Sequence, residues 1–261
     1  MEKSMTKGTL PDIIFGINPI LEALLAGKRT FNKITVAKGA QHHRILQILR
    51  LAREKKIPVQ YTDRRQLDRL TGRANHQGLI AYIAPVGYKS PEEIIAKAKL
   101  KGREALLCLL DEIADPHNLG AIIRSAEVLG VDGIVITRHH SCPVTGTVEK
   151  TSAGAIEHIP VARVDSLAGF IEKLKEAGFW IAGADMKSGA CYKADLRGPL
   201  ALVIGAEDKG LKRLVREKCD FLIGIPMAGK IASLNASCAA SILIYEILRQ
   251  RKMIDKRPST A

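Results

Sequence analysis

The sequence has few aromatic residues and no long apolar run. Phe, Trp and Tyr make up 4% of its 261 residues, so it offers no evident set of aromatic rings on which single-stranded bases could stack. No stretch approaches the roughly 18 uninterrupted apolar residues that a membrane span requires, which excludes membrane-spanning proteins. Residues 1–8 are polar and lysine-bearing and lack the apolar core of a secretion signal, so we expect a cytoplasmic protein.

Cysteine is also scarce and shows no pattern. The five cysteines are widely spaced, odd in number and never arranged as Cys-x-x-Cys, which argues against a disulfide framework and against a zinc site. His139, His140 and Cys142 lie close together, but their segment is a polar turn with no second ligand cluster. We interpret it as a solvated loop and expect no metal.

Basic residues outnumber acidic ones. The chain has 40 Lys and Arg against 27 Asp and Glu, which gives a formal net charge of +13 and a pI near 9.6. Lys and Arg that neutralise phosphates release condensed counterions, so a nucleic acid is the favoured partner. With 261 residues, 46% of them hydrophobic, the chain is long enough for two modest domains with packed cores.

The first part of the chain, residues 1–85, predicts a small αβ domain. Apolar residues have helical spacing in two segments, 17–26 and 44–55, and strand-like runs occur at 33–37, 59–61 and 79–84. A basic connection before the last strand is expected to bind substrate RNA, with a solvated helix face as the alternative for each residue. The expected RNA-binding residues are Arg64, Arg65, Arg69, Arg73 and His76.

The second part, residues 104–251, predicts an α/β domain with a parallel sheet and helices on both faces. Apolar runs of strand length alternate with amphipathic helices there, as in strands that are buried on both sides. The runs are 105–110, 133–137, 159–164, 179–184, 200–205 and 221–225. The lysine-rich segment 86–103 is interpreted as an interdomain linker, and residues 252–261 are expected to form a flexible tail.

Ligands of a parallel α/β sheet gather where strands end and helices begin, so the loops after these strands are the expected places for a site. The first such loop opens the segment 115–127. Asp115 or Asn118 suits a helix N-cap, and Arg124 suits an ion pair with Glu127. These local roles do not explain why Asn118 and Arg124, which suit a sugar and a phosphate, lie so close together at the end of a strand.

The second loop begins at Gly205. Gly205 and Gly210 are spaced as in a phosphate-binding loop, but Leu211 stands where that loop needs its lysine. Glu207 and Asp208 would also repel phosphates, so an NTPase is excluded. No Gly-x-Gly-x-x-Gly follows a predicted strand either, and the common dinucleotide fingerprint is therefore missing.

The third loop opens the segment 225–237 and precedes an apolar helix at about 236–248. Ser233 or Asn235 suits the N-cap of that helix. A long non-helical run around Gly229 exposes backbone N–H and C=O groups, which can bind a neutral heterocycle.

These three segments resemble, in order and spacing, the three motifs of the SpoU/TrmH branch of the SPOUT methyltransferases. The motifs stand at 115–127, 202–211 and 225–246, and the resemblance covers about 11–251. The whole chain resembles bacterial 23S rRNA guanosine-2′-O-methyltransferases, which carry an N-terminal domain similar to a ribosomal protein. Cys238 stands where the family has a small aliphatic residue, and because Cys packs as a small hydrophobe the match is hardly affected.

The resemblance implies a sheet domain with a C-terminal trefoil knot and a bent S-adenosylmethionine bound in its loops. It also implies a homodimer whose active site is completed across the interface. Gly205, Ile225 and Leu234 match positions that contact the cofactor, mostly through backbone atoms, and we add Met227 and Ala184 to this set. The polar residues of the catalytic face are Asn118, Arg124, Glu207, Ser233 and Asn235.

The implied function is methylation of the ribose 2′-oxygen of a nucleotide in 23S rRNA, expected to be a guanosine. The alternatives are a methyltransferase of the same family that acts on tRNA or on an adenosine, and a catalytically silent RNA-binding or ribosome-assembly protein. Arg124 is expected to clamp phosphate and hydroxyl rather than act as the base, because a guanidinium has a pKa above about 12. The identity of the base and of the modified nucleotide stays open.

Overall fold

The computed structural model describes residues 12–40, 42–229 and 233–251, and these form two compact units. The first unit runs to Gly87 and also includes Val144–Glu157, and the second comprises Tyr88–Pro143 and the chain from His158 onward. The tail expected at 252–261 lies outside the described residues. Within the described ranges, no helix combines the length and the apolar character needed to pass through a membrane.

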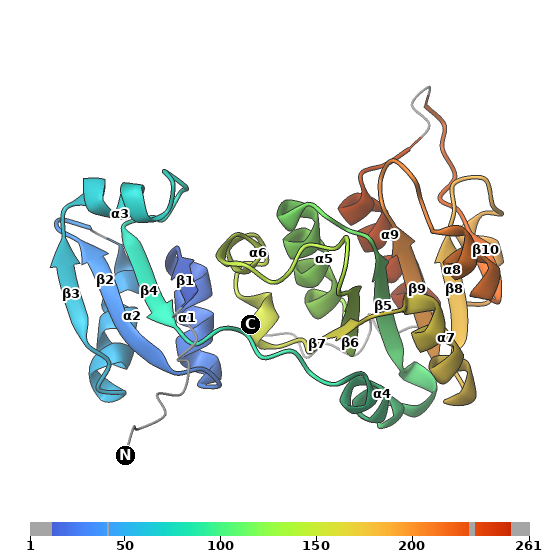
Figure 1. The fold of residues 1–261 in the computed structure, drawn as a ribbon, viewed down its shortest axis with the longest axis horizontal. Coiled ribbons are helices and arrows are strands. Elements are labelled where there is room, and N and C mark those ends of the chain that lie inside the picture. The colour runs from blue at the N-terminus through green and yellow to red at the C-terminus, as the bar shows by residue number, and fades with distance from the viewer. Residues whose placement is uncertain (1–11, 41, 230–232, 252–261) are drawn as a thin grey trace, which may run out of the picture. The chain divides into compact units, whose positions relative to one another are not determined.

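The first unit is built on a four-stranded mixed sheet (Figure 1). The strand order is β1-β4-β2-β3, in which β2 and β3 are parallel and the other neighbours are antiparallel. Helices α1 and α2 pack their apolar stripes on one face and bury Ile20, Ile34 and Ile48 completely. The elements are β1 (Asp12–Phe15), α1 (Ile17–Ala26), β2 (Phe31–Ala37), α2 (His43–Glu54), β3 (Val59–Thr62), α3 (Arg64–Leu70) and β4 (Leu79–Ile83).

Two segments of the first unit differ from the sequence-based description. The basic connection forms helix α3, which buries only Leu67 and therefore gives no apolar periodicity to detect. The segment Val144–Glu157, which lies between two strands of the second unit in the sequence, groups with the first unit. It contains α6 (Gly146–Thr151) and the short 3₁₀ helix η2 (Ala155–Glu157).

The second unit is built on a six-stranded sheet in which all neighbouring strands are parallel. Its order is β10-β8-β9-β5-β6-β7, so β9 lies in the middle and β10, the next strand in the chain, lies at the edge beside β8. The strands are β5 (Leu106–Asp111), β6 (Gly133–Thr137), β7 (Val161–Val164), β8 (Trp180–Ala184), β9 (Leu200–Gly205) and β10 (Phe221–Ile223).

Helices cover both faces of this sheet. On one face α4, α7 and α8 pack against Leu107, Leu109 and Val203, and α5 and α9 lie against each other in the other layer. The α/β class with a parallel sheet flanked by helices is thereby confirmed. The helices are α4 (Pro91–Lys99), α5 (Pro116–Val128), α7 (Leu167–Glu176), α8 (Arg213–Lys218) and α9 (Ala236–Gln250), with 3₁₀ turns η1 (Gly102–Glu104) and η3 (Cys191–Lys193).

The segment expected to be a linker, 86–103, belongs to the second unit from Tyr88 onward. It contains α4, whose capping box joins Ser90 and Glu93 through two reciprocal hydrogen bonds of 3.1 and 2.8 Å. Ile94 and Ala98 of α4 are buried in the core of the second unit. The trefoil knot stays a prediction, because strand order does not define chain threading and 230–232 lie outside the described residues.

Candidate active site

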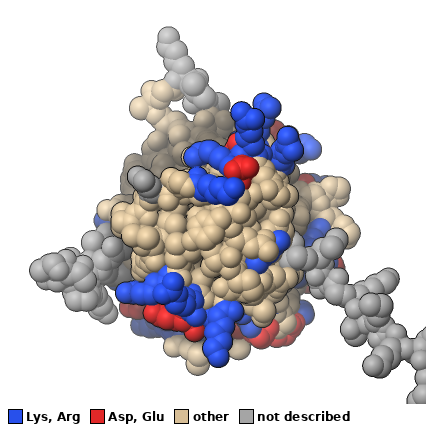
Figure 2. Space-filling view, turned by 90° about the vertical axis from the view of Figure 1, so that its left-hand side faces the viewer, with Lys and Arg blue, Asp and Glu red and all other residues tan. Residues whose placement is uncertain are grey.

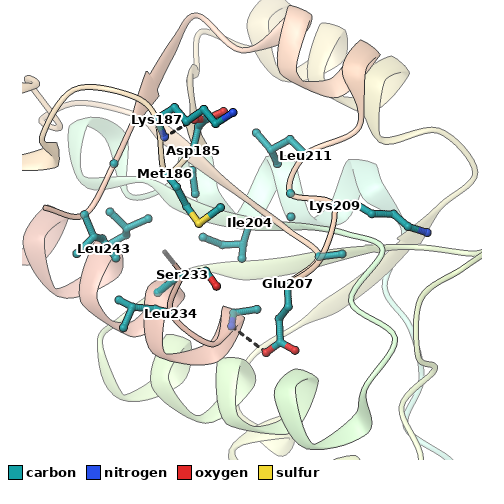
Figure 3. Close-up of a pocket in the computed structure, with 18 of the residues that line it drawn as sticks. Asp185, Met186, Lys187, Ile204, Glu207, Lys209, Leu211, Ser233, Leu234 and Leu243 are labelled. Atoms are coloured by element: carbon teal, nitrogen blue, oxygen red, sulfur yellow. Dashed lines mark hydrogen bonds between the residues drawn. The ribbon is translucent and has the colours of Figure 1, made fainter. Parts of the chain in front are cut away.

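A cavity of about 330 Å³ opens where three parallel strands of the second unit end (Figure 3). The loops after β8 and β9, the segment after β10 and the first turns of α9 all contribute to its walls. A volume of this size is within the range of small-molecule sites, and the end of a parallel strand is where such sites occur. Its apolar wall includes Ile204, Leu211, Ile223, Leu234 and Leu243.

Most of the residues predicted from the three motifs lie at this cavity. Seven of them line it directly, and two more reach it through a hydrogen-bonded cluster described below. The remaining member, Arg124, is not in the lining. The seven are Ala184, Gly205, Glu207, Ile225, Met227, Ser233 and Leu234.

The loop after β9 is held by close backbone packing. A Cβ atom at Gly205 would lie 2.2 Å from the carbonyl carbon of Gly210, so only glycine fits there. Gly210 adopts a φ of 65° and donates its N–H to the carbonyl of Ala206 at 2.8 Å. Asp111, at the end of the neighbouring strand β5, accepts the N–H of Lys212 at 2.7 Å and so fixes the end of the loop.

Asp111 is a buried carboxyl that the sequence did not single out. It is only 1% exposed, and burial raises its pKa, although the N–H of Lys212 and the charge of Lys212 act in the opposite direction. The signal that identifies it is its place at the carboxyl end of a central strand, in register with Gly205.

Glu207 joins the three motifs in one hydrogen-bonded cluster. Its Oε1 accepts from Nδ2 of Asn118 at 2.9 Å, from the N–H of Ala236 at 3.1 Å, and from Nδ2 of Asn235. Nδ2 of Asn235 also donates to Oδ1 of Asn118 at 2.9 Å. A carboxylate at the start of α9 is favoured by the helix dipole, so the cluster places a fixed negative charge at the cavity wall.

Helix capping and site geometry use the same residues. Asn235 is the N-cap of α9, and its Oδ1 accepts from the N–H groups of Ser237 and Cys238. Asp115 caps α5 by accepting the N–H of His117 at 2.8 Å, which leaves the buried Asn118 to reach Glu207. The capping role proposed for Asn235 is thus compatible with its place in the cluster.

Arg124 lies on α5 with an exposed side chain. The expected alternative, an ion pair with Glu127, does not form in the structure of the described residues, and its guanidinium has no other partner there. A hydrogen bond of 2.8 Å between Ser125 and Ser241 holds α5 against α9 beside it. Arg124 is therefore available to a ligand that approaches from outside this cavity.

The turn after β8 and helix α8 add charged residues that the sequence did not single out. Asp185, Lys187 and Arg216 line the cavity, and Arg216 forms an ion pair with Asp185. In Figure 3, Asp185 and Lys187 lie at one end of the cavity and Glu207 and Ser233 at the other. The sequence places Asp185 directly after the predicted strand 179–184, which could have marked it as a site residue. It lies outside the three motifs, however, and no other polar residue of a motif stands next to it.

His76 takes a different place from the one expected. It is 1% exposed in the first unit, where its Nδ1 accepts the N–H of Gly78 at 2.9 Å and its Nε2 lies 3.0 Å from Oδ1 of Asp68. With both ring nitrogens engaged inside the unit, the side chain cannot contact RNA in this conformation. The prediction that His76 binds RNA is therefore corrected: His76 has a structural role and holds the segment before β4 in place.

The four arginines predicted to bind RNA are exposed on or beside α3. Figure 2, which faces the N-terminal side of the ribbon in Figure 1, shows Lys and Arg gathered at the upper and lower rims around a surface with few charges. No ion pair of these four side chains occurs among the described residues. They are Arg64, Arg65, Arg69 and Arg73.

Comparison with known proteins assigns a family to both units. Residues 105–245 match the SpoU rRNA methylase family, and residues 13–89 match the substrate-binding domain of RNA 2′-O ribose methyltransferases. The chain is 43% identical over 245 residues to YacO of Bacillus subtilis, a TrmH family protein whose name leaves tRNA or rRNA open as the substrate. This alignment covers 93% of the chain and 97% of YacO.

Two solved structures extend the comparison. The SpoU methyltransferase AviRb from Streptomyces viridochromogenes, solved with the cofactor AdoMet, has a TM-score of 0.76 at 25% identity and covers 92% of this chain and 90% of its own. The TrmH/SpoU tRNA-modifying enzyme of A. aeolicus has a TM-score of 0.54 at 26% identity and covers 65% of this chain and 89% of its own.

Proposed function

The chain belongs to the SpoU rRNA methylase family, and on that premise we propose that it methylates the ribose 2′-oxygen of a guanosine in 23S rRNA. Membership makes it an S-adenosylmethionine-dependent RNA 2′-O-ribose methyltransferase. The observation that carries the proposal is the cavity at the ends of β8, β9 and β10, with Glu207, Asn118 and Asn235 clustered at its wall.

The cavity fits the chemistry of S-adenosylmethionine. Apolar side chains such as Ile204, Leu211 and Leu243 suit a heterocycle, and charged groups at both ends suit the polar parts of the molecule. Gly205 and Gly210, whose backbones pack closely against each other, both line the cavity and so bring main-chain groups to its wall. When bound, this cofactor supplies an electrophilic methyl group on a sulfonium. Gly205, Ile225, Met227, Leu234 and Ala184 are the residues that we propose hold it.

The chain's own contribution to the reaction is positioning and charge. Asn118, Asn235 and Ser233 present polar groups beside Glu207 and suit the orientation of a ribose. Holding the reacting groups in line removes much of the entropic cost of the encounter. Arg124 suits a phosphate and a developing alkoxide, since its planar guanidinium can make two hydrogen bonds at once.

A homodimer would bring Arg124 to a site on the partner. Val128, one turn after Arg124 on α5, is 54% exposed, and Ile242 and Tyr245 on α9 are 42% and 49% exposed. Helices α5 and α9 are neighbours, so these apolar side chains lie on adjacent surfaces that a second copy of the chain can bury. We therefore propose that Arg124 acts at an active site that two chains complete together.

The separate RNA-binding unit supports rRNA over tRNA as the substrate. The A. aeolicus tRNA-modifying enzyme covers 65% of this chain, so about a third of the chain has no counterpart in it. Methylation of a tRNA or of an adenosine remains the second candidate, since YacO is named for both tRNA and rRNA. A silent RNA-binding protein is the third, and the complete polar cluster argues against it.

The decisive experiment compares RNA from cells with and without the gene by mapping 2′-O-methyl sites. Loss of one methylated guanosine in 23S rRNA is expected, and loss of a tRNA site instead would replace the proposed substrate. Calorimetry with the purified chain tests the cofactor independently of the RNA substrate. S-adenosylmethionine and S-adenosylhomocysteine should bind, and ATP and NAD should not. Binding of ATP or NAD with no response to S-adenosylhomocysteine would remove the methyltransferase assignment.

A further inference from the structure

Asp185 places a fixed carboxylate at the end of the cavity opposite Glu207 (Figure 3). It directly follows β8, and its side chain is only 10% exposed although it lines the cavity. The carboxylate is thus shielded from bulk water on most sides while it remains next to the space that a ligand would fill. Such a group suits specific recognition rather than a general surface charge.

The position of this carboxylate is set by several contacts. Its Oδ1 accepts the N–H of Lys187 at 2.7 Å, and its Oδ2 accepts Nη1 of Arg216 from α8. The N–H of Asp185 donates to the carbonyl of Ile223 at 2.9 Å, which ties the turn to β10. A Cβ atom at Gly224 would lie 2.8 Å from the carbonyl oxygen of Ser188, so the turn and the end of β10 pack closely.

The local charge indicates what kind of group this carboxylate can accept. An ionised carboxylate has about four acceptor sites, and the two described hydrogen bonds leave others available. Asp185, Lys187 and Arg216 together carry a formal charge of +1, which disfavours a cationic partner such as an ammonium group. Neutral hydroxyl groups remain, and an acidic side chain that hydrogen-bonds ribose hydroxyls is a known solution at the ends of parallel strands.

We propose that Asp185 accepts hydrogen bonds from the ribose hydroxyls of the cofactor's adenosine and that Arg216 is a positioning residue which holds the carboxylate for this contact. The inference rests on the proposed function, because it takes S-adenosylmethionine as the ligand of the cavity. The apolar wall that includes Ile204 and Leu243 lies between the two ends of the cavity and suits the adenine (Figure 3).

The test measures ligand binding to the full chain by calorimetry. The ligands are S-adenosylhomocysteine, 5′-methylthioadenosine, which keeps the ribose but lacks the amino-acid part, and the 2′,3′-dideoxy analogue of 5′-methylthioadenosine. Asp185→Asn is expected to weaken the first two by the same factor, about tenfold or more, because a hydrogen bond to a charged group is lost. The dideoxy analogue should bind the unaltered chain and the Asp185→Asn variant equally.

Three outcomes overturn the inference. If Asp185→Asn weakens only S-adenosylhomocysteine, the carboxylate recognises the amino-acid part. If it weakens the dideoxy analogue as much as 5′-methylthioadenosine, the loss comes from the shape of the turn. If it weakens no ligand, Asp185 makes no contact. Failure of the unaltered chain to bind any of the three ligands would instead refute the proposed function.

The role of Arg216 is tested on the same ligands. Arg216→Gln should lower affinity for 5′-methylthioadenosine but not for its dideoxy analogue, and in the Asp185→Asn background it should have little further effect. Arg213→Gln is the matched control, since Arg213 lies on the same helix with a side chain that is 91% exposed and paired with Glu217. Equal losses for Arg216→Gln and Arg213→Gln would overturn the positioning role.

Discussion

At Arg124, a substitution can distinguish a role on the helix surface from a role in catalysis. Arg124 lies outside the cavity and has no partner in the described structure, so Arg124→Ala should leave S-adenosylhomocysteine affinity nearly unchanged. We expect its single-turnover methylation rate to fall by about a hundredfold or more, as for the loss of one oxyanion-stabilising donor. Rapid-quench assays on an RNA substrate measure this rate.

Two further variants define the chemistry at this position. Arg124→Lys keeps the charge but not the planar fork, so it should restore the rate only weakly. Glu127→Gln is the control and should have the activity of the unaltered chain, because no pair between the two residues forms in the described structure. Full activity of Arg124→Ala would mean that Arg124 is a surface residue with no part in catalysis. Full activity of Arg124→Lys would mean that positive charge alone suffices at this position.

Asp111 connects the site to the pH dependence of stability. Burial raises its pKa above the ordinary value of 3.8, so the folded state holds the proton more tightly than the unfolded state. As the pH rises from below 3.8 through the raised pKa, this group makes a progressively less favourable contribution to folding. Asp111→Asn keeps an acceptor for the N–H of Lys212 and removes the buried charge. The stability of the variant relative to the unaltered chain should therefore improve as the pH rises through this range.

Urea unfolding at a series of pH values measures this difference. Asp195→Asn is a control of opposite sign, because a hydrogen bond from the exposed Arg197 lowers the pKa of Asp195 to about 2. A group with a lowered pKa contributes above 3.8 and loses its contribution as the pH falls. The relative stability of Asp195→Asn should thus improve as the pH falls. A pH-independent difference for Asp111→Asn would show that its burial does not matter for stability.

At the scale of elements, strand β9 is expected to tolerate no side chain at its last residue, Gly205, where the following loop packs against it. Gly205→Ala would place a Cβ atom 2.2 Å from the backbone of Gly210, and the whole loop with Glu207 must then shift. We expect a loss of about 1–3 kcal/mol in the free energy of unfolding. Affinity for S-adenosylhomocysteine should fall at least tenfold, as calorimetry would show.

Gly189→Ala is the matched substitution in the turn after β8. No atom lies within 4 Å of a Cβ built at Gly189, so stability should change by less than about 0.5 kcal/mol and affinity hardly at all. Equal effects of the two substitutions would show that close packing at Gly205 is not what the cavity depends on.

Helix α3 is the element expected to bind RNA. Replacing Arg69 on α3 and Arg73 just after it by Gln should weaken binding to an rRNA fragment and lower the slope of log affinity against log salt by about 0.7 to 0.9 for each lost phosphate contact. Arg50→Gln on α2 is the control, because Arg50 is similarly exposed but lies by Glu54. Filter binding at several salt concentrations measures both the affinity and the slope. If neither changes in the variant of Arg69 and Arg73, the RNA-binding surface lies elsewhere on the chain.

The elements differ in how far the sequence reveals them. Continuous apolar runs located the strands of the second unit because both sheet faces are buried, and loops at their ends therefore marked the site. Helix α3 was considered only as an alternative, because it buries only Leu67 and so has no apolar stripe. His76 was assigned to the RNA-binding surface, but a histidine ring can be buried when both of its nitrogens are hydrogen-bonded. The meeting of Asn118 with Glu207 depends on β5 lying beside β9, a pairing that local patterns do not encode.

At the scale of the whole molecule, the chain passes between the two units three times. Val144–Glu157 leaves the second unit after β6, folds with the first unit and returns before β7. Buried ion pairs hold it there: Nη1 of Arg29 donates to Glu149 at 2.7 Å and to Glu157 at 2.8 Å, with side-chain exposures of 6%, 2% and 4%. Nε of Arg29 also donates to the carbonyl of Ala84 at 2.6 Å. A single arginine in the sequence gives no sign of this role.

Arg29→Met should destabilise the first unit by about 3–5 kcal/mol, because two buried carboxylates lose their guanidinium partner. The triple variant Arg29→Met, Glu149→Gln, Glu157→Gln should recover most of that loss, since replacing buried charges is far less costly than leaving them without a counter-charge. Affinity for S-adenosylhomocysteine should stay unchanged, because the cavity belongs to the second unit.

Two spectroscopic signals separate the unfolding of the two units. Trp180 on β8 is the chain's one tryptophan, so its fluorescence follows the second unit, whereas circular dichroism follows both. In urea, the dichroism transition of Arg29→Met should begin at lower denaturant while the Trp180 transition stays in place. A joint shift of both signals would mean that the segment makes the two units unfold as one, and no shift in either would mean that these buried pairs contribute little.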